Sequence, residues 1–286
     1  MKIIKYFFEF IFIIFFFIIF KIIGYKNASN LGEKIGRYIG PLFRSNHKIQ
    51  SNLKNSNVGN TFEERKDIIK KMWGNYGRIF AEYMYIKEFR NNKLLGNIEI
   101  VGEKILDEIK NKQKPVIFVS GHFNNFELMA MYLEKSGIKL SAIYRPLNNI
   151  FLNKIMETIR KKYICRNQIK KGIGGLKKLI ELKKNNYSSA LMIDQRVSEG
   201  IFSPLFNKRA LTTTIPAQLV KRFNIPIVPV YIERIKGLKF KIIINQPLFF
   251  SQDASQQEIT DDLNQILEKF ILSKPANWIW SHNRWK

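Results

Sequence analysis

A histidine and a glutamate stand close together where a predicted strand gives way to a predicted helix. The chain has three histidines in 286 residues, and His122 directly follows an apolar run that ends at Gly121. Glu127 comes within the next predicted turn. A carboxylate bound to one ring nitrogen fixes the tautomer of a histidine and raises the basicity of the other nitrogen. The spacing therefore predicts a general base that removes a proton from a hydroxyl.

The same spacing also has a purely structural interpretation. A helix capped by Asn124 would place Glu127 at its third position, where a capping-box carboxylate stands. His122 would then be an ordinary loop histidine. From these residues alone both interpretations stay open.

Other reactive groups are poorly placed for catalysis. Ser120 lies on the strand itself, and Cys165 is far along the chain, so the pair would act on a substrate hydroxyl directly. His47 and His282 lie in unrelated segments without the spacing of metal ligands, and no metal is expected.

Short apolar runs alternate with amphipathic segments after residue 115. The runs predict strands at 115–121, 140–145, 189–194, 226–234 and 240–248. Helical periodicity predicts helices at 125–136, 150–163, 173–184, 214–223 and 256–272. This order is typical of an α/β fold with a mostly parallel sheet covered by helices.

Polar side chains follow three of these strands. His122 follows the first strand, Arg145 the second, and Asp194 and Gln195 the third. Ligands of open α/β sheets bind outside the carboxyl ends of the strands, so a site is expected there. A salt bridge between Arg145 and Asp194 is the structural alternative for that arginine.

The N-terminus predicts a membrane anchor over residues 1–26. Residues 3–23 are apolar apart from Lys5, Glu9 and Lys21. As a helix they would measure about 31 Å, enough to cross a bilayer core. A spanning helix, a helix lying deep in the interface and a cleaved signal peptide are the alternatives, and an uncleaved anchor is favoured because no convincing cleavage site follows.

The remaining residues, 27–286, are expected to form one catalytic domain, with a helical region at 27–114 and an α/β core at 115–286. The charge is +25, from 48 Lys and Arg against 23 Asp and Glu. This excess, where it is not compositional drift, suggests nucleic acid, anionic lipid or an acidic protein as partner. Positive charge is heavier after the anchor than before it, which favours a cytoplasmic domain.

The motifs along residues 30–286 together resemble one family, the lipid A biosynthesis acyltransferases that act late as lauroyl or myristoyl transferases. They are GHFNNFE, YRPLNN, KKGIGGLKKL, DQRVSEGIFSPLFNKRALTTTIPAQLVKR and PANWIWSHNRWK, in this order. The resemblance implies a fold like that of the glycerolipid acyltransferases and a place at the bacterial inner membrane. It implies an acyl-carrier-protein thioester as donor, a hydroxyl on a hydroxyacyl chain of an anionic lipid A precursor as acceptor, and no cofactor.

The resemblance also implies roles for single residues. His122 matches the catalytic histidine of the family and Glu127 its carboxylate partner. Arg145 matches a characteristic arginine, and Asp194 with Gln195 matches the family's Asp-Gln pair.

The chain departs from the family pattern at three positions. Asn124 and Asn207 replace glycines, and Phe126 replaces a tryptophan. Asparagine tolerates a left-handed backbone better than other non-glycine residues, so both turns are expected to survive.

Further binding residues are candidates only. Arg145, Arg166 and the backbone N–H groups at the start of the 125–136 helix are candidates for stabilising an oxyanion. A helix N-terminus beside basic residues would suit a phosphate of the acceptor. The candidates for that site are Lys208, Arg209, Thr213 and Thr214; an ordinary helix cap with solvated neighbours is the alternative.

Two other functions are weighed against acyl transfer onto lipid A. The first is acyl transfer onto another glycolipid or phospholipid, with acyl-CoA as donor. The second is a membrane-tethered nucleic-acid-binding protein, which would explain the charge but neither His122 with Glu127 nor the Asp-Gln pair. No nucleic-acid partner is expected, because the chain lacks an aromatic-rich recognition motif.

Overall fold

The computed structural model describes residues 2–285. Its helices are α1 Lys2–Phe43, α2 Asn46–Asn55, α3 Phe62–Glu82, α4 Ile86–Arg90, α5 Glu103–Lys112, α6 Glu127–Lys135, α7 Ile150–Ile159, α8 Ile173–Lys184, α9 Ile215–Phe223 and α10 Gln256–Ser273. Its strands are β1 Ile98–Val101, β2 Ile117–Ser120, β3 Leu140–Tyr144, β4 Asn167–Lys170, β5 Ser188–Met192, β6 Ile201–Leu205, β7 Lys208–Thr212, β8 Ile227–Lys236 and β9 Lys239–Ile244.

Seven strands form the central sheet in the order β1-β9-β8-β2-β5-β3-β4. Neighbouring strands run parallel except for β8 and β9, which pair antiparallel. The expected α/β fold with a mostly parallel sheet is therefore confirmed. β1 is an edge strand of this sheet, so the sheet takes in part of the region 27–114 that was expected to be helical.

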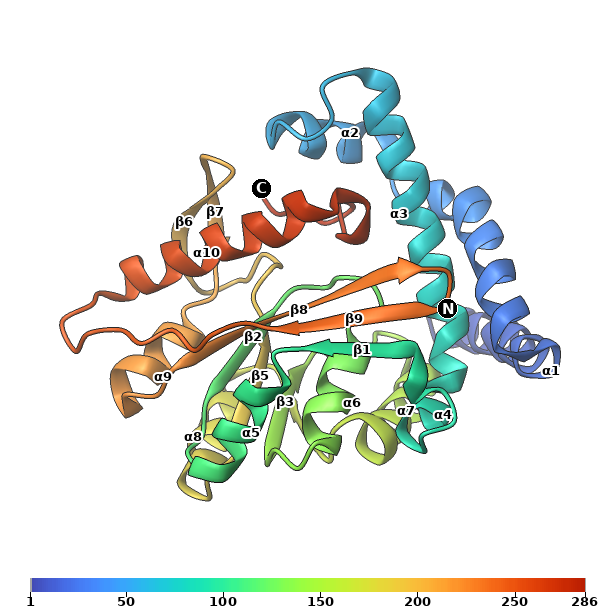
Figure 1. Ribbon diagram of the computed structural model, residues 1–286. Helices are drawn as coiled ribbons and strands as arrows, with labels where there is room; N and C mark the ends of the chain where they lie inside the picture. The colour runs from blue at the N-terminus through green and yellow to red at the C-terminus, as the bar shows by residue number, and fades with distance from the viewer. Residues whose placement is uncertain (1, 286) are drawn as a thin grey trace.

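Side chains of the central strands alternate between two hydrophobic clusters. Phe118 and Val228 belong to the cluster that includes α6 and the C-terminal part of α10. Ile117 and Val119 belong to the cluster that includes α8, α9 and the N-terminal part of α10. Figure 1 shows helices on both sides of the strands. A sheet buried on both faces explains why its strands read as continuous apolar runs.

The short strands and the hairpin were not predictable from the sequence pattern. β1 and β4 have four residues each, too few to show a period. The hairpin of β6 and β7 was missed as well, although its two-residue turn has left-handed φ values at Phe206 (54°) and Asn207 (55°). Two positive φ values are typical of a type I′ turn, which asparagine accommodates.

The helix α1 is interrupted near its middle. Gly24 has φ 79° and ψ 160° there, a conformation that favours glycine. The helix therefore runs past the expected anchor boundary at residue 26, and its second half packs along α3 (Figure 1).

Glycines allow α1 and α3 to approach closely. A Cβ atom on Gly77 of α3 would lie 1.8 Å from the carbonyl oxygen of Gly32 on α1, and one on Gly36 would lie 2.2 Å from the carbonyl oxygen of Trp73. The contact therefore requires the absence of side chains on both helices.

Gly77→Ala is expected to destabilise the protein, because a clash with backbone cannot be relieved by rotating a side chain. The expected loss is about 1–3 kcal/mol or more. Gly174→Ala in α8 is the matched control, because nothing lies within 4 Å of its added Cβ. Urea unfolding in detergent, followed by tryptophan fluorescence, measures both. Equal stabilities of the two variants would contradict the close α1–α3 contact.

Candidate active site

The carboxyl ends of β2, β3 and β5 meet at one edge of the sheet. His122 lies in the loop that leaves β2 there. Asn124, in the same loop, has φ 42° and is fully buried, so the left-handed turn expected at this departure from glycine is present. The ring of Phe126 packs edge-on against the His122 ring with centroids 4.7 Å apart.

Asp194 is the carboxylate that binds the His122 ring. Its Oδ1 lies 2.8 Å from Nδ1 of His122. Its Oδ2 accepts from the backbone N–H of His122 at 2.9 Å and from the indole N–H of Trp278 at 3.0 Å. The side chain of Asp194 is fully buried, whereas that of His122 is 21% exposed. Asp194 therefore holds the His122 ring on the buried side, and the ring remains partly exposed to solvent.

The charges of these two residues are coupled. Burial raises the pKa of Asp194, but the neighbouring His122 and its hydrogen bonds outweigh this and bring the pKa to about 2. Burial lowers the pKa of His122, and the Asp194 carboxylate reverses this, so the pKa lies above its ordinary value. An ionised Asp194 accepts from Nδ1–H, which assigns the lone pair of the neutral ring to Nε2.

Glu127 has a different partner from the expected one. Its Oε1 accepts from Nε and one terminal nitrogen of Arg160, at 2.8 and 2.6 Å. The helix α6 begins at Glu127 itself, and its N-cap residue is Phe126. Because the helix starts two residues later than predicted, Glu127 is neither the third helical residue nor part of a capping box. Its charge still contributes to the raised pKa of His122.

Gln195 connects His122 to a second histidine. Its Nε2 lies 3.4 Å from Nε2 of His122 and 3.0 Å from Nε2 of His282. Burial lowers the pKa of His282, and the negative charge of Asp194 opposes this without reversing it. A neutral His282 can therefore accept a hydrogen bond from the Gln195 amide.

The C-terminal segment supplies residues that sequence analysis did not assign to the site. Trp278, Trp280 and Arg284 are at most 1% exposed. Trp278 contacts Asp194, and His282 contacts Gln195. Three tryptophans near the chain end were a usable signal for packing onto the domain, but nothing in their spacing indicated which groups they would meet.

The two arginines expected near the oxyanion lie apart. Arg145 follows β3 at the edge that carries His122, is exposed, and its charge is felt by His282. Arg166 precedes β4, so it lies at the amino edge of the sheet, opposite the site, where its side chain is 82% exposed and approaches Glu134. Arg160 acts on His122 electrostatically instead.

The four residues expected to bind a phosphate are spread from the start of β7 to the start of α9. Lys208 and Arg209 begin β7 at the tip of the hairpin, and Thr214 is the N-cap residue of α9. The length of β7 separates these ends by about 13 Å. Thr214 makes no side-chain cap bond, and Thr213 Oγ1 receives a long one, 3.4 Å, from the N–H of Ile215. Arg209 stacks on Phe202.

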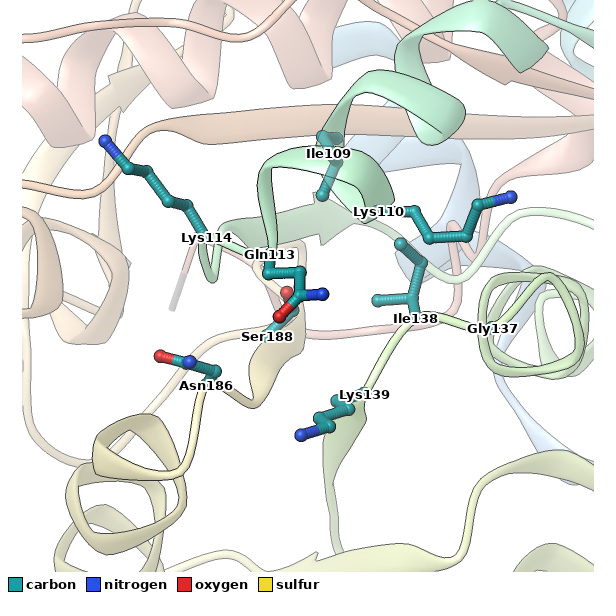
Figure 2. A pocket seen from close by; sticks show the side chains of 9 residues that line it. All are labelled: Ile109, Lys110, Gln113, Lys114, Gly137, Ile138, Lys139, Asn186 and Ser188. Carbon is teal, nitrogen blue, oxygen red and sulfur yellow. The ribbon is translucent and has the colours of Figure 1, made fainter.

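A cavity of about 270 Å³, shown in Figure 2, is lined by none of the site residues described above. Its lining comes from the end of α5 and the starts of β3 and β5, among them Lys110, Lys139 and Ser188. These are amino ends of parallel strands, whereas His122 follows a carboxyl end.

Within residues 2–285 no group of three or more His, Cys, Asp or Glu side chains could hold a metal ion. Burial raises the pKa of the Cys165 thiol to about 12.

Comparison with known proteins places the chain in a family. The model of the bacterial lipid A biosynthesis acyltransferases matches residues 1–286. The lipid A biosynthesis acyltransferase 2 of Shigella flexneri is 24% identical over 255 residues, which cover 86% of this chain and 80% of that protein. The lipid A biosynthesis myristoyltransferase of Escherichia coli (strain K12) is 21% identical over 251 residues, covering 86% and 77%.

Two further matches are a curated relative and a solved structure. The lipid A biosynthesis lauroyltransferase of Escherichia coli (strain K12) is 24% identical over 234 residues, covering 78% of this chain and 73% of that protein. Among solved structures, the 1-acyl-sn-glycerophosphate (LPA) acyltransferase PlsC from Thermotoga maritima superposes with a TM-score of 0.43 and 14% identity. It covers 89% of this chain and 96% of that one, and the superposition is too loose to carry residue correspondences.

Proposed function

The chain belongs to the bacterial lipid A biosynthesis acyltransferase family, and on this premise we propose that it moves a fatty acyl chain from an acyl-carrier-protein thioester to a hydroxyl of a hydroxyacyl chain on a lipid A precursor. The observation that carries the proposal is the bond between Asp194 and Nδ1 of His122. It leaves the lone pair of the partly exposed His122 ring on Nε2, at the edge of the sheet where ligands bind.

In the proposed mechanism His122 acts as general base. Nε2 takes the proton of the acceptor hydroxyl, and the resulting imidazolium is stabilised by Asp194. The hydroxyl oxygen forms a bond to the thioester carbonyl carbon, the carbon–sulfur bond breaks, and His122 returns the proton to the leaving thiolate. General-base catalysis of this kind contributes on the order of 10²–10⁴ in rate.

The negative charge on the carbonyl oxygen needs a donor. Arg160 is better placed for this than Arg145 or Arg166, because its charge is felt at His122 and it is held by the buried Glu127. In this proposal Glu127 fixes the position of Arg160 and adds negative charge near the base. It takes no proton itself.

Two features of the chain support a membrane substrate and a charged donor. The helix α1 is the one described helix long and apolar enough to cross a membrane, by length and composition, and 11% of its most apolar window is buried. The net charge of +25 suits both an acidic carrier protein and an anionic lipid. We propose attachment to the inner membrane with the catalytic domain in the cytoplasm.

An acyl transfer assay tests the proposal. Purified protein in detergent receives acyl-carrier-protein thioesters of several chain lengths and a tetra-acylated lipid A precursor. A product heavier by one acyl chain in mass spectrometry is expected. Parallel reactions with acyl-CoA, and with a lysophospholipid as acceptor, test the alternative donor and acceptor. Absence of product with every carrier-protein donor would overturn the proposal.

A further inference from the structure

The first half of α1 has one docked face and one open face. Its docked face contacts α7 through Phe10, whose ring lies 5.7 Å from that of Phe151. Further along it contacts α3 through Phe17, whose ring lies 5.0 Å from that of Phe80. Phe20, on the same face, is fully buried.

The open face is apolar along its whole length. Six of its side chains follow each other at helical spacing of three or four residues and are between 49% and 78% exposed: Ile4, Phe8, Ile11, Phe15, Ile18 and Ile22. An apolar stripe of this length is rare on a protein surface that faces water. It requires an apolar partner that is itself long and flat.

The domain contacts this helix near both of its ends. Near the start, Nδ2 of Asn149 donates to the carbonyl oxygen of Tyr6 at 2.8 Å. Near the end, Nζ of Lys21 donates to the carbonyl oxygen of Met84 at 3.2 Å. The fifteen residue steps from Tyr6 to Lys21 correspond to about 22 Å of helix. The helix is therefore a strip along the side of the domain.

A helix docked in this way cannot stand across a bilayer without pulling the domain in with it. Arg145 and Lys154 flank the Asn149 contact and are exposed. A charged side chain at the centre of the hydrocarbon is strongly unfavourable even on permissive scales. A helix lying in the plane of one leaflet meets no such cost, because these charges then face lipid headgroups.

We propose that residues 2–23 lie flat in one leaflet of an anionic phospholipid bilayer, with both ends of the helix on the side of the domain. Three exposed cations complement the lipid charge: Lys5 in the helix, and Arg145 and Lys154 on either side of Asn149 in the sequence. Leu147 and Ile150, 39% and 51% exposed, add apolar surface on either side of Asn149, which contacts the helix. Because this segment follows the carboxyl end of β3, the proposal turns that end of the sheet toward the bilayer. The inference rests on the membrane attachment proposed above, and not on acyl transfer.

Single-cysteine labelling tests the orientation. Cys165 is 1% exposed and is replaced in a Cys165→Ser background. Lys5→Cys reports on the start of the helix, and Lys112→Cys reports on the domain; the two lysine side chains are 74% and 68% exposed. A membrane-impermeant maleimide is applied to sealed membrane vesicles of both orientations. Labelling of both cysteines from the same side is expected. Labelling from opposite sides, or of Lys5→Cys from neither side, would overturn the proposal.

Vesicle binding tests the stripe itself. Phe8→Lys with Phe15→Lys is expected to weaken binding to vesicles of phosphatidylglycerol and phosphatidylethanolamine by at least about tenfold, because two large apolar side chains no longer enter the lipid. Phe62→Lys, on an equally exposed phenylalanine of α3 (59%), is the matched control and should bind as the wild type. Equal binding of both variants would contradict the inference. Acyl transfer to a detergent-dispersed acceptor, measured on the same variants, separates this result from failure of the proposed reaction.

Discussion

Asp194→Asn is expected to slow acyl transfer by about 10⁴-fold, as loss of the orienting carboxylate does in other histidine-base enzymes. The hydrogen bonds explain why so small a change matters. Two N–H groups, from the His122 backbone and Trp278, converge on Oδ2. The single oxygen of an asparagine must stay there, which turns its NH₂ group toward Nδ1. The NH₂ group then donates to Nδ1 and leaves the proton of the ring on Nε2, where the base should be.

The pH dependence of the rate gives this prediction a second readout. The wild-type rate should rise with pH through the raised pKa of His122, because only the neutral ring accepts a proton. Asparagine removes the negative charge that raises this pKa, so the acidic limb of the residual activity should move to lower pH. Rates measured from pH 5 to 9 check the direction.

Two comparisons make the outcome decisive. Asp253→Asn, on an exposed aspartate outside the site, should leave both rate and profile unchanged. The rate of acyl transfer should fall at least as far in His122→Ala as in Asp194→Asn. An Asp194→Asn enzyme with a normal rate would refute the assigned tautomer, and full activity of His122→Ala would refute the mechanism while leaving the family assignment intact.

The sequence was sufficient to predict which polar side chains follow the carboxyl ends of neighbouring strands. His122, Arg145, Asp194 and Gln195 all follow strands whose carboxyl ends share one edge, and this follows from chain direction in a parallel sheet. The prediction failed on which carboxylate binds the histidine. Glu127 is the nearer candidate in sequence, whereas Asp194 is placed by the pairing of β2 with β5, a contact across 72 residues.

The same reasoning explains the other misses. The contacts of Trp278 and His282 depend on where the chain end folds back, which no local pattern encodes. The separation of Lys208 from Thr214 follows from a hairpin that the sequence pattern did not reveal. Conversely, the left-handed turn at Asn124 was predictable, because it depends on the conformational preference of one residue. The turn at Asn124 was therefore accessible from sequence, while pairing between distant segments was not.

Arg234→Met is expected to destabilise the protein strongly, because it leaves the buried carboxylate of Glu82 without its charged partner. Glu82 is fully buried and accepts from both terminal nitrogens of Arg234 at 2.8 and 2.9 Å. Its other donors are Ser29 of α1 and Asn125 of the His122 loop. Removing one partner of a buried ion pair costs about 3–5 kcal/mol.

Denaturation in urea, followed by tryptophan fluorescence in detergent, measures this loss. Lys236→Met, on the same strand but exposed, is the control and should change stability by less than about 0.5 kcal/mol. Adding Glu82→Gln to Arg234→Met should recover part of the loss, since a neutral amide leaves no unpaired charge. If Arg234→Met costs as little stability as Lys236→Met, the buried Glu82 carboxylate does not hold α1, α3 and β8 against the loop that carries His122. A large loss that Glu82→Gln reverses would show that this buried carboxylate joins the docked helix to the loop carrying His122.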